Sequence, residues 1–378
     1  MNVPLLDLKV QYATIAKEVE PELLRIARTQ MCILGADVEL LEKNLADYLK
    51  VKHTIAVSSG SDAILMSLMA LGIGPDDEVI LPTFSFFATA GCVARLFAKP
   101  VFVDSETNTF NIDPALIEAK ITRKTKAIMP VHLFGQSAKM DEITKIAQKY
   151  NIPVIEDAAQ ALGTQYKDGR FVGSIGDMGC YSFYPSKNLG AFGDGGLIAT
   201  NNDELATKLK QMRNHGMNPK YYHKFIGGNF RLDAIQAVVL NIKLKYLNNW
   251  HRGRQKNANL YRNYFKKYEL LDIVTVPQEL YQDSGQNNHH IYNQFTIQVP
   301  NRNKLKEFLS QNSIGCDIYY PVPFHRQECF DYLNCNDTDY PVANRFADTV
   351  LSLPVYPELG EEQIEFVVQT IKKFYDNN

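Results

Sequence analysis

The chain has 378 residues, of which 45% are apolar and 22% charged, so it is long enough to bury a large core in one or two domains. Its formal net charge of −2 gives no electrostatic reason to expect nucleic-acid binding. The six cysteines show no C-x-x-C pair or metal-ligand spacing, and no apolar run has the length of a membrane span or a signal-peptide core. We therefore expect a cytoplasmic protein of enzyme size with reduced thiols and no metal site.

Short apolar runs alternate with amphipathic stretches between His53 and Asn201, after a first segment, 1–12, that is expected to be extended. Helices are predicted at 13–30, 37–50, 61–72, 85–96, 113–120 and 139–150. Strands are predicted for the runs TIAVSS, EVILP, PVFVD, AIMPV, PVIED, CYSFY and LIATN. Continuous β-branched strands separated by helices indicate a mainly parallel, seven-stranded sheet with helices on both faces, which is an α/β fold.

The remaining third of the sequence predicts a smaller α/β unit. Further helices are predicted from Asp203 and at 232–249, 251–268, 302–312 and 361–375. NQFTIQV is predicted to be a strand, and the prolines of IYYPVPFHRQECF predict a loop. We expect a large domain over 13–250 and a small C-terminal domain over 251–378, to which the N-terminal segment 1–12 is added.

Lys187 ends the stretch SFYPSK and is followed by the small-residue run NLGAFGDGG. Small residues let the backbone approach a flat ligand closely, and a desolvated lysine is a nucleophile that condenses with aldehydes. Asp157 ends the strand-like run PVIED and is the kind of buried carboxylate that keeps a pyridinium nitrogen protonated. This pair is what pyridoxal 5'-phosphate (PLP) chemistry needs. Taken singly, Lys187 could be a solvated loop lysine and Asp157 a helix cap.

Gly60 and Ser61 in SSGSDA place backbone N–H groups and a hydroxyl at a predicted helix N-terminus, which is a natural phosphate site. The alternative is a plain helix cap at Ser61. Ser182, five residues before Lys187, is near enough in sequence to help hold a phosphate.

Aromatic and amide side chains also follow the predicted strands. Of the three phenylalanines in PTFSFFATAG, one could stack on a flat ring, while core packing accounts for at least two of them. Gln160 could donate to a phenolic oxygen, or could simply be a polar residue near a helix start.

The order of these motifs resembles the DegT/DnrJ/StrS family of nucleotide-sugar aminotransferases, which are PLP enzymes of the aspartate-aminotransferase fold type. The resemblance covers essentially the whole chain, from PLLDL to LSLPVYPEL. The segments that carry it are ILGADVELLEKNLADYL, SSGSDA, DDEVILPTFSFFATA, KPVFVD, TKAIMPVHLFGQ, VIEDAAQALG, YSFYPSKNLGAFGDGG, GGNFRLDAIQA and YYPVPFHRQ. Each motif alone is weak, and their common order makes the match specific.

The resemblance implies roles for single residues. Lys187 would bind PLP covalently, Asp157 would pair with the pyridine nitrogen, Gln160 with the ring hydroxyl, and Phe86 would stack on the ring. The implied phosphate contacts are Gly60, Ser61, Ser182 and, across the interface of a homodimer with shared active sites, Asn229.

The implied substrates are glutamate as amino donor and a nucleotide-linked keto sugar as acceptor, for the synthesis of cell-surface polysaccharide or lipopolysaccharide. Within the family, the loop YYPVPFHRQ together with HLFGQ looks most like members that aminate carbon 3 of a UDP- or dTDP-linked sugar, such as a 3-keto N-acetylhexosamine. A 4-keto-6-deoxy sugar is the alternative acceptor. The predicted substrate contacts are Tyr184, Arg231, Tyr319, Tyr320 and His325.

Two residues depart from the family pattern, namely Ser61 in place of the usual threonine and Tyr319 in place of a frequent histidine. The serine keeps the hydroxyl, and Tyr319 affects substrate recognition only. Family members that dehydrate their substrate replace the lysine with histidine, so Lys187 argues against that reaction. A cysteine desulfurase would need a catalytic cysteine on a mobile loop, for which the sequence offers no clear candidate. A regulatory protein without catalysis is the alternative from another class, although the sequence contains no helix-turn-helix motif or basic face to support it.

Overall fold

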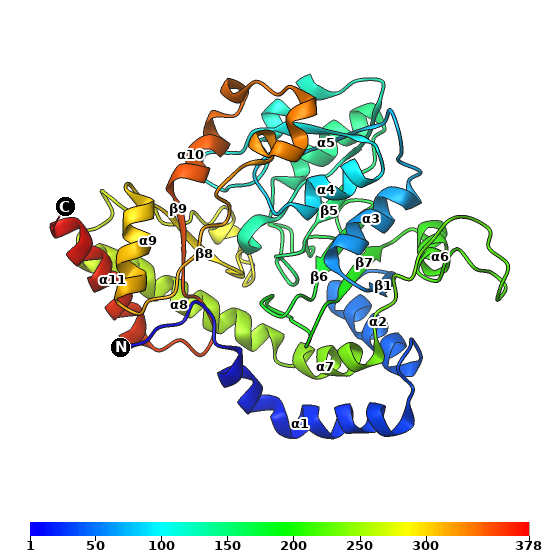
Figure 1. Ribbon diagram of the computed structural model, residues 1–378, viewed down its shortest axis with the longest axis horizontal. Coiled ribbons are helices and arrows are strands. Elements are labelled where there is room, and N and C mark those ends of the chain that lie inside the picture. Colours follow the sequence, from blue (N-terminus) through cyan, green and yellow to red (C-terminus); the bar gives the residue numbers. More distant parts are fainter. Residues whose placement is uncertain (378) are drawn as a thin grey trace.

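The computed structural model describes residues 1–377, which form an α/β fold built on one large sheet (Figure 1). Its strands are β1 (His53–Val57), β2 (Glu78–Pro82), β3 (Lys99–Val103), β4 (Thr125–Ile128), β5 (Ile155–Asp157), β6 (Met178–Ser182) and β7 (Gly196–Thr200). The ladders give the orders β3–β2–β4 and β5–β6–β7–β1, and the bridges Ile128–Val154 and Val131–Asp157 join the two sets. Strand β7 is antiparallel to β1 and β6, and the other ladders are parallel. The predicted mainly parallel sheet of seven strands is confirmed.

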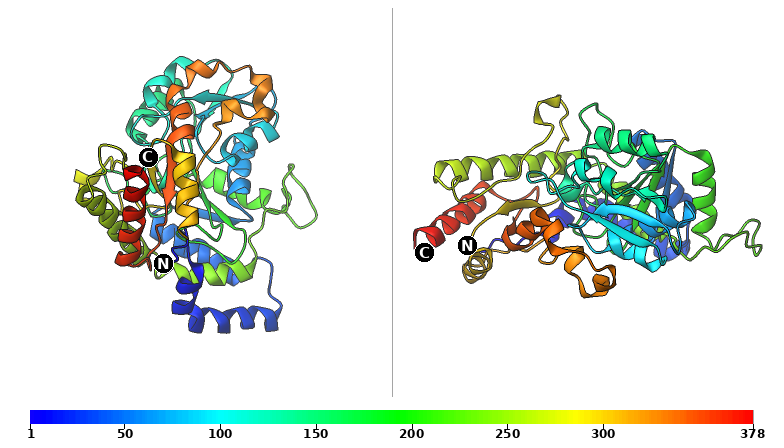
Figure 2. Two further views of the ribbon diagram at one scale, coloured as in Figure 1. Left: turned by 60° about the vertical axis from the view of Figure 1, so that its left-hand side comes forward. Right: turned by 90° about the horizontal axis from the view of Figure 1, so that it is seen from above.

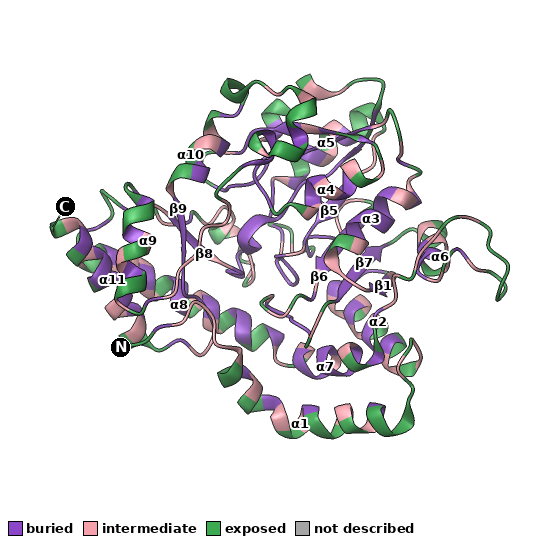
Figure 3. Ribbon diagram, viewed as in Figure 1, coloured by how far each residue is buried: buried purple, intermediate pink, exposed green. Residues whose placement is uncertain are grey.

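Helices cover both faces of this sheet (Figures 1 and 2). They are α1 (Leu8–Thr29), α2 (Ala36–Leu49), α3 (Gly60–Ala70), α4 (Ala88–Arg95), α5 (Met140–Tyr150), α6 (Asp203–Met212) and α7 (Ala234–Leu244). Val57 and Ile198 share a buried core with α3, α4 and α6, whereas Ala56 and Leu197 face α2 and α7. Because successive residues of a strand point to opposite faces, a strand covered on both sides is buried along its whole length, as Figure 3 shows for β7.

The C-terminal part forms a separate packed layer. It contains the antiparallel pair β8 (Phe295–Gln298) and β9 (Val350–Leu353) and the helices α8 (Leu247–Lys267), α9 (Arg302–Gln311), α10 (Pro341–Thr349) and α11 (Glu361–Asp376). Its core cluster joins Tyr261, Phe295 and Phe374 to Val3, whose backbone pairs with Ile314. The stretch that contains Phe324 and Phe346 packs instead on the core under α3 and α4.

Several expected elements differ from the structure. The first helix starts inside the segment expected to be extended, because the Asp7 carboxylate caps it by accepting from the Lys9 backbone N–H at 3.0 Å. Residues 113–120 form two short 3₁₀ turns at Pro114–Leu116 and Glu118–Lys120 rather than an α-helix. The break between α7 and α8 falls at Lys245 and Tyr246 rather than near residue 250, because i→i+3 hydrogen bonds tighten the turn there.

The loop predicted for IYYPVPFHRQECF contains the 3₁₀ turns Phe324–Arg326 and Glu328–Leu333. Strand β9 and helix α10 were not expected from the sequence. The predicted domain boundary after residue 250 falls inside α8, a continuous helix of 21 residues.

Candidate active site

Lys187 lies in the turn that follows β6, where its backbone N–H donates to the Tyr184 carbonyl at 2.8 Å. Burial lowers the pKa of its amine to about 8, although the nearby Asp157 carboxylate opposes this shift. A lysine in this environment has a substantial neutral fraction near physiological pH, which is the form that attacks a carbonyl carbon.

Asp157 ends β5, and its carboxylate accepts hydrogen bonds from the Thr89 hydroxyl at 2.8 Å and from the Ala159 backbone N–H at 3.2 Å. The residue is 4% exposed, and burial raises the pKa of its carboxyl group, with Thr89, Ala159 and Lys187 opposing. A buried carboxylate gains from a cationic partner. The site therefore fits a protonated pyridine nitrogen, which would be such a partner.

Thr89 and Glu156 support Asp157 and were not recognised in the sequence. The Glu156 carboxylate is fully buried and accepts from the backbone N–H groups of Gly173, Ile175 and Gly176 at 2.6–2.7 Å and from His132 Nε2 at 2.8 Å. These bonds fix β5 to the loop beside it, one residue before Asp157. The clue in the sequence is a second carboxylate at the end of an apolar strand, which is rarely buried without a set of donors.

Gln160 makes two side-chain hydrogen bonds within the chain. Its side-chain oxygen accepts from the Phe134 backbone N–H at 2.7 Å, and its nitrogen donates to the Tyr320 hydroxyl at 3.0 Å. The Tyr320 ring in turn lies 6.2 Å from the ring of Phe86, which is 57% exposed. The structure thus brings Phe86, Gln160 and Tyr320 together, with Phe86 largely exposed.

Gly60 and Ser182 meet where the N-terminus of α3 approaches the end of β6. A Cβ atom added at Gly60 would lie 2.7 Å from the Ser182 Cβ, so a larger residue would close this approach. The cap of α3 is Ser59, not Ser61, because the Ser59 hydroxyl accepts from the Asp62 backbone N–H at 3.0 Å. Ser61 remains exposed in the first turn, and the helix N-terminus can accommodate an anion.

The predicted substrate residues fall into two groups. Tyr184 is exposed in the turn before Lys187, and Tyr319 is half-buried and lines a cavity that also includes Ser186. His325 is buried and uses both ring nitrogens, toward Thr83 Oγ1 at 2.8 Å and Asn344 Oδ1 at 3.0 Å. Arg231 donates to Asn214 Oδ1 at 2.6 Å within its own loop.

Asn229 is exposed at the base of a loop that projects from the body after α6 (Figure 1). A backbone bridge pairs it with Asn214, and the next residue, Phe230, accepts from the Ser58 backbone N–H at 3.0 Å. This places the loop base beside the end of β1, near the N-terminus of α3.

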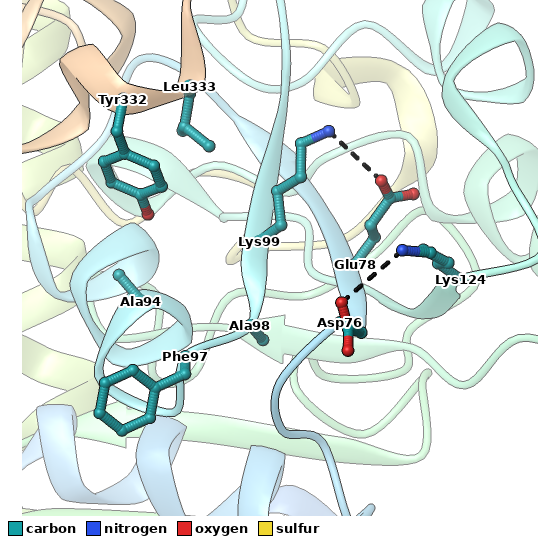
Figure 4. Close-up of a pocket in the computed structure, with 9 residues that line it drawn as sticks. All are labelled: Asp76, Glu78, Ala94, Phe97, Ala98, Lys99, Lys124, Tyr332 and Leu333. Carbon is teal, nitrogen blue, oxygen red and sulfur yellow. Dashed lines mark hydrogen bonds and ion pairs between the residues drawn. The ribbon is translucent and has the colours of Figure 1, made fainter.

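A cavity of about 670 Å³ lies at the opposite edge of the sheet (Figure 4). Its lining includes Glu78 and Lys99, the first residues of β2 and β3, whereas Asp157 lies at the carboxyl end of a strand. Lys99 pairs with Glu78 at 3.4 Å and Lys124 with Asp76 at 3.8 Å. Since ligands of parallel sheets bind at the carboxyl ends of the strands, we place the active site at the Lys187 edge.

None of the helices within residues 1–377 is long and apolar enough to cross a membrane. The same part of the chain contains no group of three or more His, Cys, Asp or Glu residues that could hold a metal ion.

Several named proteins and solved structures are similar to this chain over nearly its whole length. A "Pleiotropic regulatory protein" from Geobacillus stearothermophilus is 47% identical over 99% of each chain. The UDP-N-acetyl-3-dehydro-α-D-glucosamine 3-aminotransferase of Acidithiobacillus ferrooxidans is 42% identical, covering 98% of this chain and 97% of its own. The crystal structure of Streptomyces venezuelae DesV, 35% identical, superposes with a TM-score of 0.93 over 99% of this chain and 98% of its own.

A further solved structure, NtdA from Bacillus subtilis, contains the cofactor PMP and superposes with a TM-score of 0.88 at 31% identity, covering 98% of this chain and 85% of its own. The model of the DegT/DnrJ/EryC1/StrS aminotransferase family matches residues 13–372. The chain therefore belongs to this family of aminotransferases.

Proposed function

We propose that this aminotransferase uses PLP to move an amino group from glutamate to carbon 3 of a UDP- or dTDP-linked 3-keto sugar. The observation that carries the proposal is a half-buried lysine, whose amine has a pKa lowered to about 8, near the buried carboxylate of Asp157 at the carboxyl edge of the sheet. The 42% identity to an aminotransferase named for a UDP-linked 3-keto sugar supports the choice of acceptor.

The residues at this edge suit PLP, which would supply an aldehyde carbon for amines and a ring that takes up electrons. We assign covalent attachment to Lys187, the pyridine nitrogen to Asp157, and ring contacts to Phe86 and Gln160. The phosphate contacts would be Gly60, Ser61, Ser182 and, from a second subunit, Asn229. When its amine is free, Lys187 would remove a proton from the donor's α-carbon and return one to the carbon that receives nitrogen.

We further propose that the enzyme is a homodimer in which the loop from Asn214 to Asn229 reaches the neighbouring active site. Tyr221, Tyr222 and Ile226 on this loop are 77%, 70% and 85% exposed. Large side chains that remain uncovered on a projecting loop are typical of a surface that packs against another chain.

We also propose that the chain divides into a large and a small domain near residue 250. The segment 1–12 would belong to the small domain, in keeping with the pairing of Val3 and Ile314. A cavity lined by Leu5, Ser186 and Tyr319 lies between these parts and the turn that carries Lys187. Tyr184 and Tyr319 would face the acceptor sugar, whereas the hydrogen bonds of Arg231 and His325 favour structural roles.

The acceptor is tested by incubating the enzyme with glutamate and each keto sugar separately, followed by mass spectrometry of the nucleotide-sugar product. We expect amination of the 3-keto compound. A 4-keto-6-deoxy sugar exposes the same electrophile and differs in how the hexose lies in the pocket. Amination of the 4-keto compound alone would overturn the proposed acceptor while leaving the aminotransferase intact.

The name of the Geobacillus relative raises a regulatory role as an alternative. A purely regulatory protein has no need of a lysine with a lowered pKa beside a buried aspartate. We expect the purified protein to show visible absorbance that disappears on borohydride reduction. A colourless protein that neither binds PLP nor consumes glutamate would favour regulation without catalysis.

A further inference from the structure

A small cavity of about 180 Å³ lies next to the residue that precedes Lys187. Its lining comes from distant parts of the chain, among them Leu5, Ser186 and Arg254. Arg254 is the charged member of the lining, and no acidic residue of the described chain lines the cavity with it. A cavity bounded in this way has a positive charge and no counter-charge of its own.

Arg254, on α8, is 4% exposed and leaves part of its guanidinium unused. Its Nη1 donates to the carbonyls of Tyr292 at 2.9 Å, Asn293 at 3.2 Å and Val355 at 2.8 Å. Its Nε has no hydrogen-bond partner in the described structure. Three backbone carbonyls thus fix Nη1 of the guanidinium, while Nε remains available as a hydrogen-bond donor.

Arg302 is a second buried arginine in this protein, and its hydrogen bonds can be compared with those of Arg254. It is 7% exposed, and its Nε, Nη1 and Nη2 donate to Asn303 Oδ1, the Val350 carbonyl and the Ala347 carbonyl at 2.7–2.8 Å. All three nitrogens are therefore used inside the protein. Within residues 1–377 the Arg254 guanidinium has no carboxylate within ion-pair distance; burial lowers its pKa to about 10, and the charge of the Glu358 carboxylate opposes this shift.

We propose that this cavity binds a carboxylate of the amino donor through Arg254. This inference rests on the proposed function, and it identifies where the amino donor binds in the same active site. The fork of a guanidinium matches the two oxygens of a carboxylate. The cavity volume of about 180 Å³ lies below the roughly 300–1,000 Å³ of pockets for larger ligands, so it suits an amino acid better than a nucleotide sugar.

The test uses the PLP-loaded enzyme and glutarate, a dicarboxylate that lacks an amine and does not react. Calorimetry measures glutarate binding, and the change in cofactor absorbance follows the half-reactions with glutamate and, in reverse, with the amino-sugar product. Arg254→Gln should weaken glutarate and glutamate binding at least about tenfold and leave the amino-sugar half-reaction unchanged. Arg302→Gln is the matched control, with no effect on the ratio of the two half-reactions.

Unchanged glutarate binding by Arg254→Gln, or an equal loss in both half-reactions, would show that Arg254 is only structural. If Arg254→Gln does not fold, Asn293→Asp gives the same information, because Asn293 also lines the cavity and a carboxylate there would pair with Arg254. It should abolish glutarate binding while retaining the melting temperature, and glutarate binding at wild-type strength would contradict the proposal. A wild-type enzyme that binds glutarate but aminates no keto sugar would overturn the proposed function instead.

Discussion

At the scale of single residues, burial shifts two pKa values in opposite directions: it lowers that of the Lys187 amine and raises that of the Asp157 carboxyl group. Removal from water favours the neutral amine of Lys187 and the neutral carboxyl of Asp157, and the attraction between their charged forms opposes both shifts. Thr89 and the Ala159 backbone N–H add hydrogen bonds that favour the ionised carboxylate. Lys187 is thereby prepared as a nucleophile and Asp157 as a partner for a cation.

Replacing Lys187 by alanine should abolish both transamination and covalent retention of PLP after borohydride reduction, because the attacking amine is gone. Mass spectrometry of the reduced protein measures the retention. Lys243→Ala is the matched control, since burial also lowers the pKa of Lys243 to about 8 while its amine donates to the Gly190 carbonyl at 2.7 Å. A trapped adduct in Lys187→Ala would show that another lysine binds the cofactor.

The pKa of Lys187 also predicts how PLP attachment to the apoprotein depends on pH. Below a pKa of about 8 the amine is mostly protonated, and above it the nucleophilic neutral form predominates. The attachment rate should therefore rise up to about pH 8 and then level off, as measured by stopped-flow absorbance. A rate that continues to rise up to pH 10 would indicate a lysine with its ordinary pKa near 10.5.

Asp157→Asn should retain PLP but slow turnover by about 10² or more, because a neutral amide cannot stabilise a protonated ring nitrogen. Steady-state kinetics with glutamate and a keto sugar would measure the loss. Asp104→Asn is a suitable control, since Asp104 is equally buried but accepts from the backbone N–H groups of Val342 and Ala343 at the start of α10. Near-normal turnover of Asp157→Asn would exclude the proposed role.

At the scale of elements, periodicity and strand composition predicted the main sheet, because its strands are short, mostly apolar runs separated by amphipathic stretches. The same reasoning could not find α10, whose first N–H groups are capped by Asp104 from 238 or more positions earlier in the chain. Nor could it show that Gln160 would bond to Tyr320, a contact that only the folded chain creates. The local sequence pattern thus predicts the strand ends at which the proposed site lies. The hydrogen bonds of each side chain depend on contacts between distant parts of the chain, which the pattern does not contain.

The N-terminus of α3 provides a prediction at this scale. Ser59→Ala removes the cap of α3 and Asn202→Ala removes that of α6, where Asn202 Oδ1 accepts from the Glu204 and Leu205 backbone N–H groups at 2.9 and 3.0 Å. Each should lower the free energy of unfolding by about 1 kcal/mol. If α3 binds the cofactor phosphate, only Ser59→Ala should also weaken PLP binding in an equilibrium titration. Equal PLP affinities in the two variants would argue against a phosphate site at α3.

At the scale of the whole molecule, the turn of the large sheet that carries Lys187 lies beside the C-terminal layer, since Ser186 and Asn293 line the same cavity. The core of the C-terminal layer is separate from those of the main sheet, yet Phe324 and Phe346 pack on the main core. The C-terminal layer is therefore anchored at one end beside the strands that carry the site. The loop that carries Asn229 projects away from this body and exposes large side chains, an arrangement that accords with the proposed homodimer (Figure 1).

Shared active sites can be tested by mixing inactive subunits. In a heterodimer of Lys187→Ala and Asn229→Ala, one site combines an intact Lys187 with an intact Asn229 of the partner subunit, while the other site has neither. Random exchange at equal amounts should restore about a quarter of wild-type activity. Lys187→Ala mixed with Asp157→Asn should restore none, because both residues belong to the same subunit's site. If Asn229→Ala is itself impaired and the first mixture stays inactive, each subunit must complete its own site.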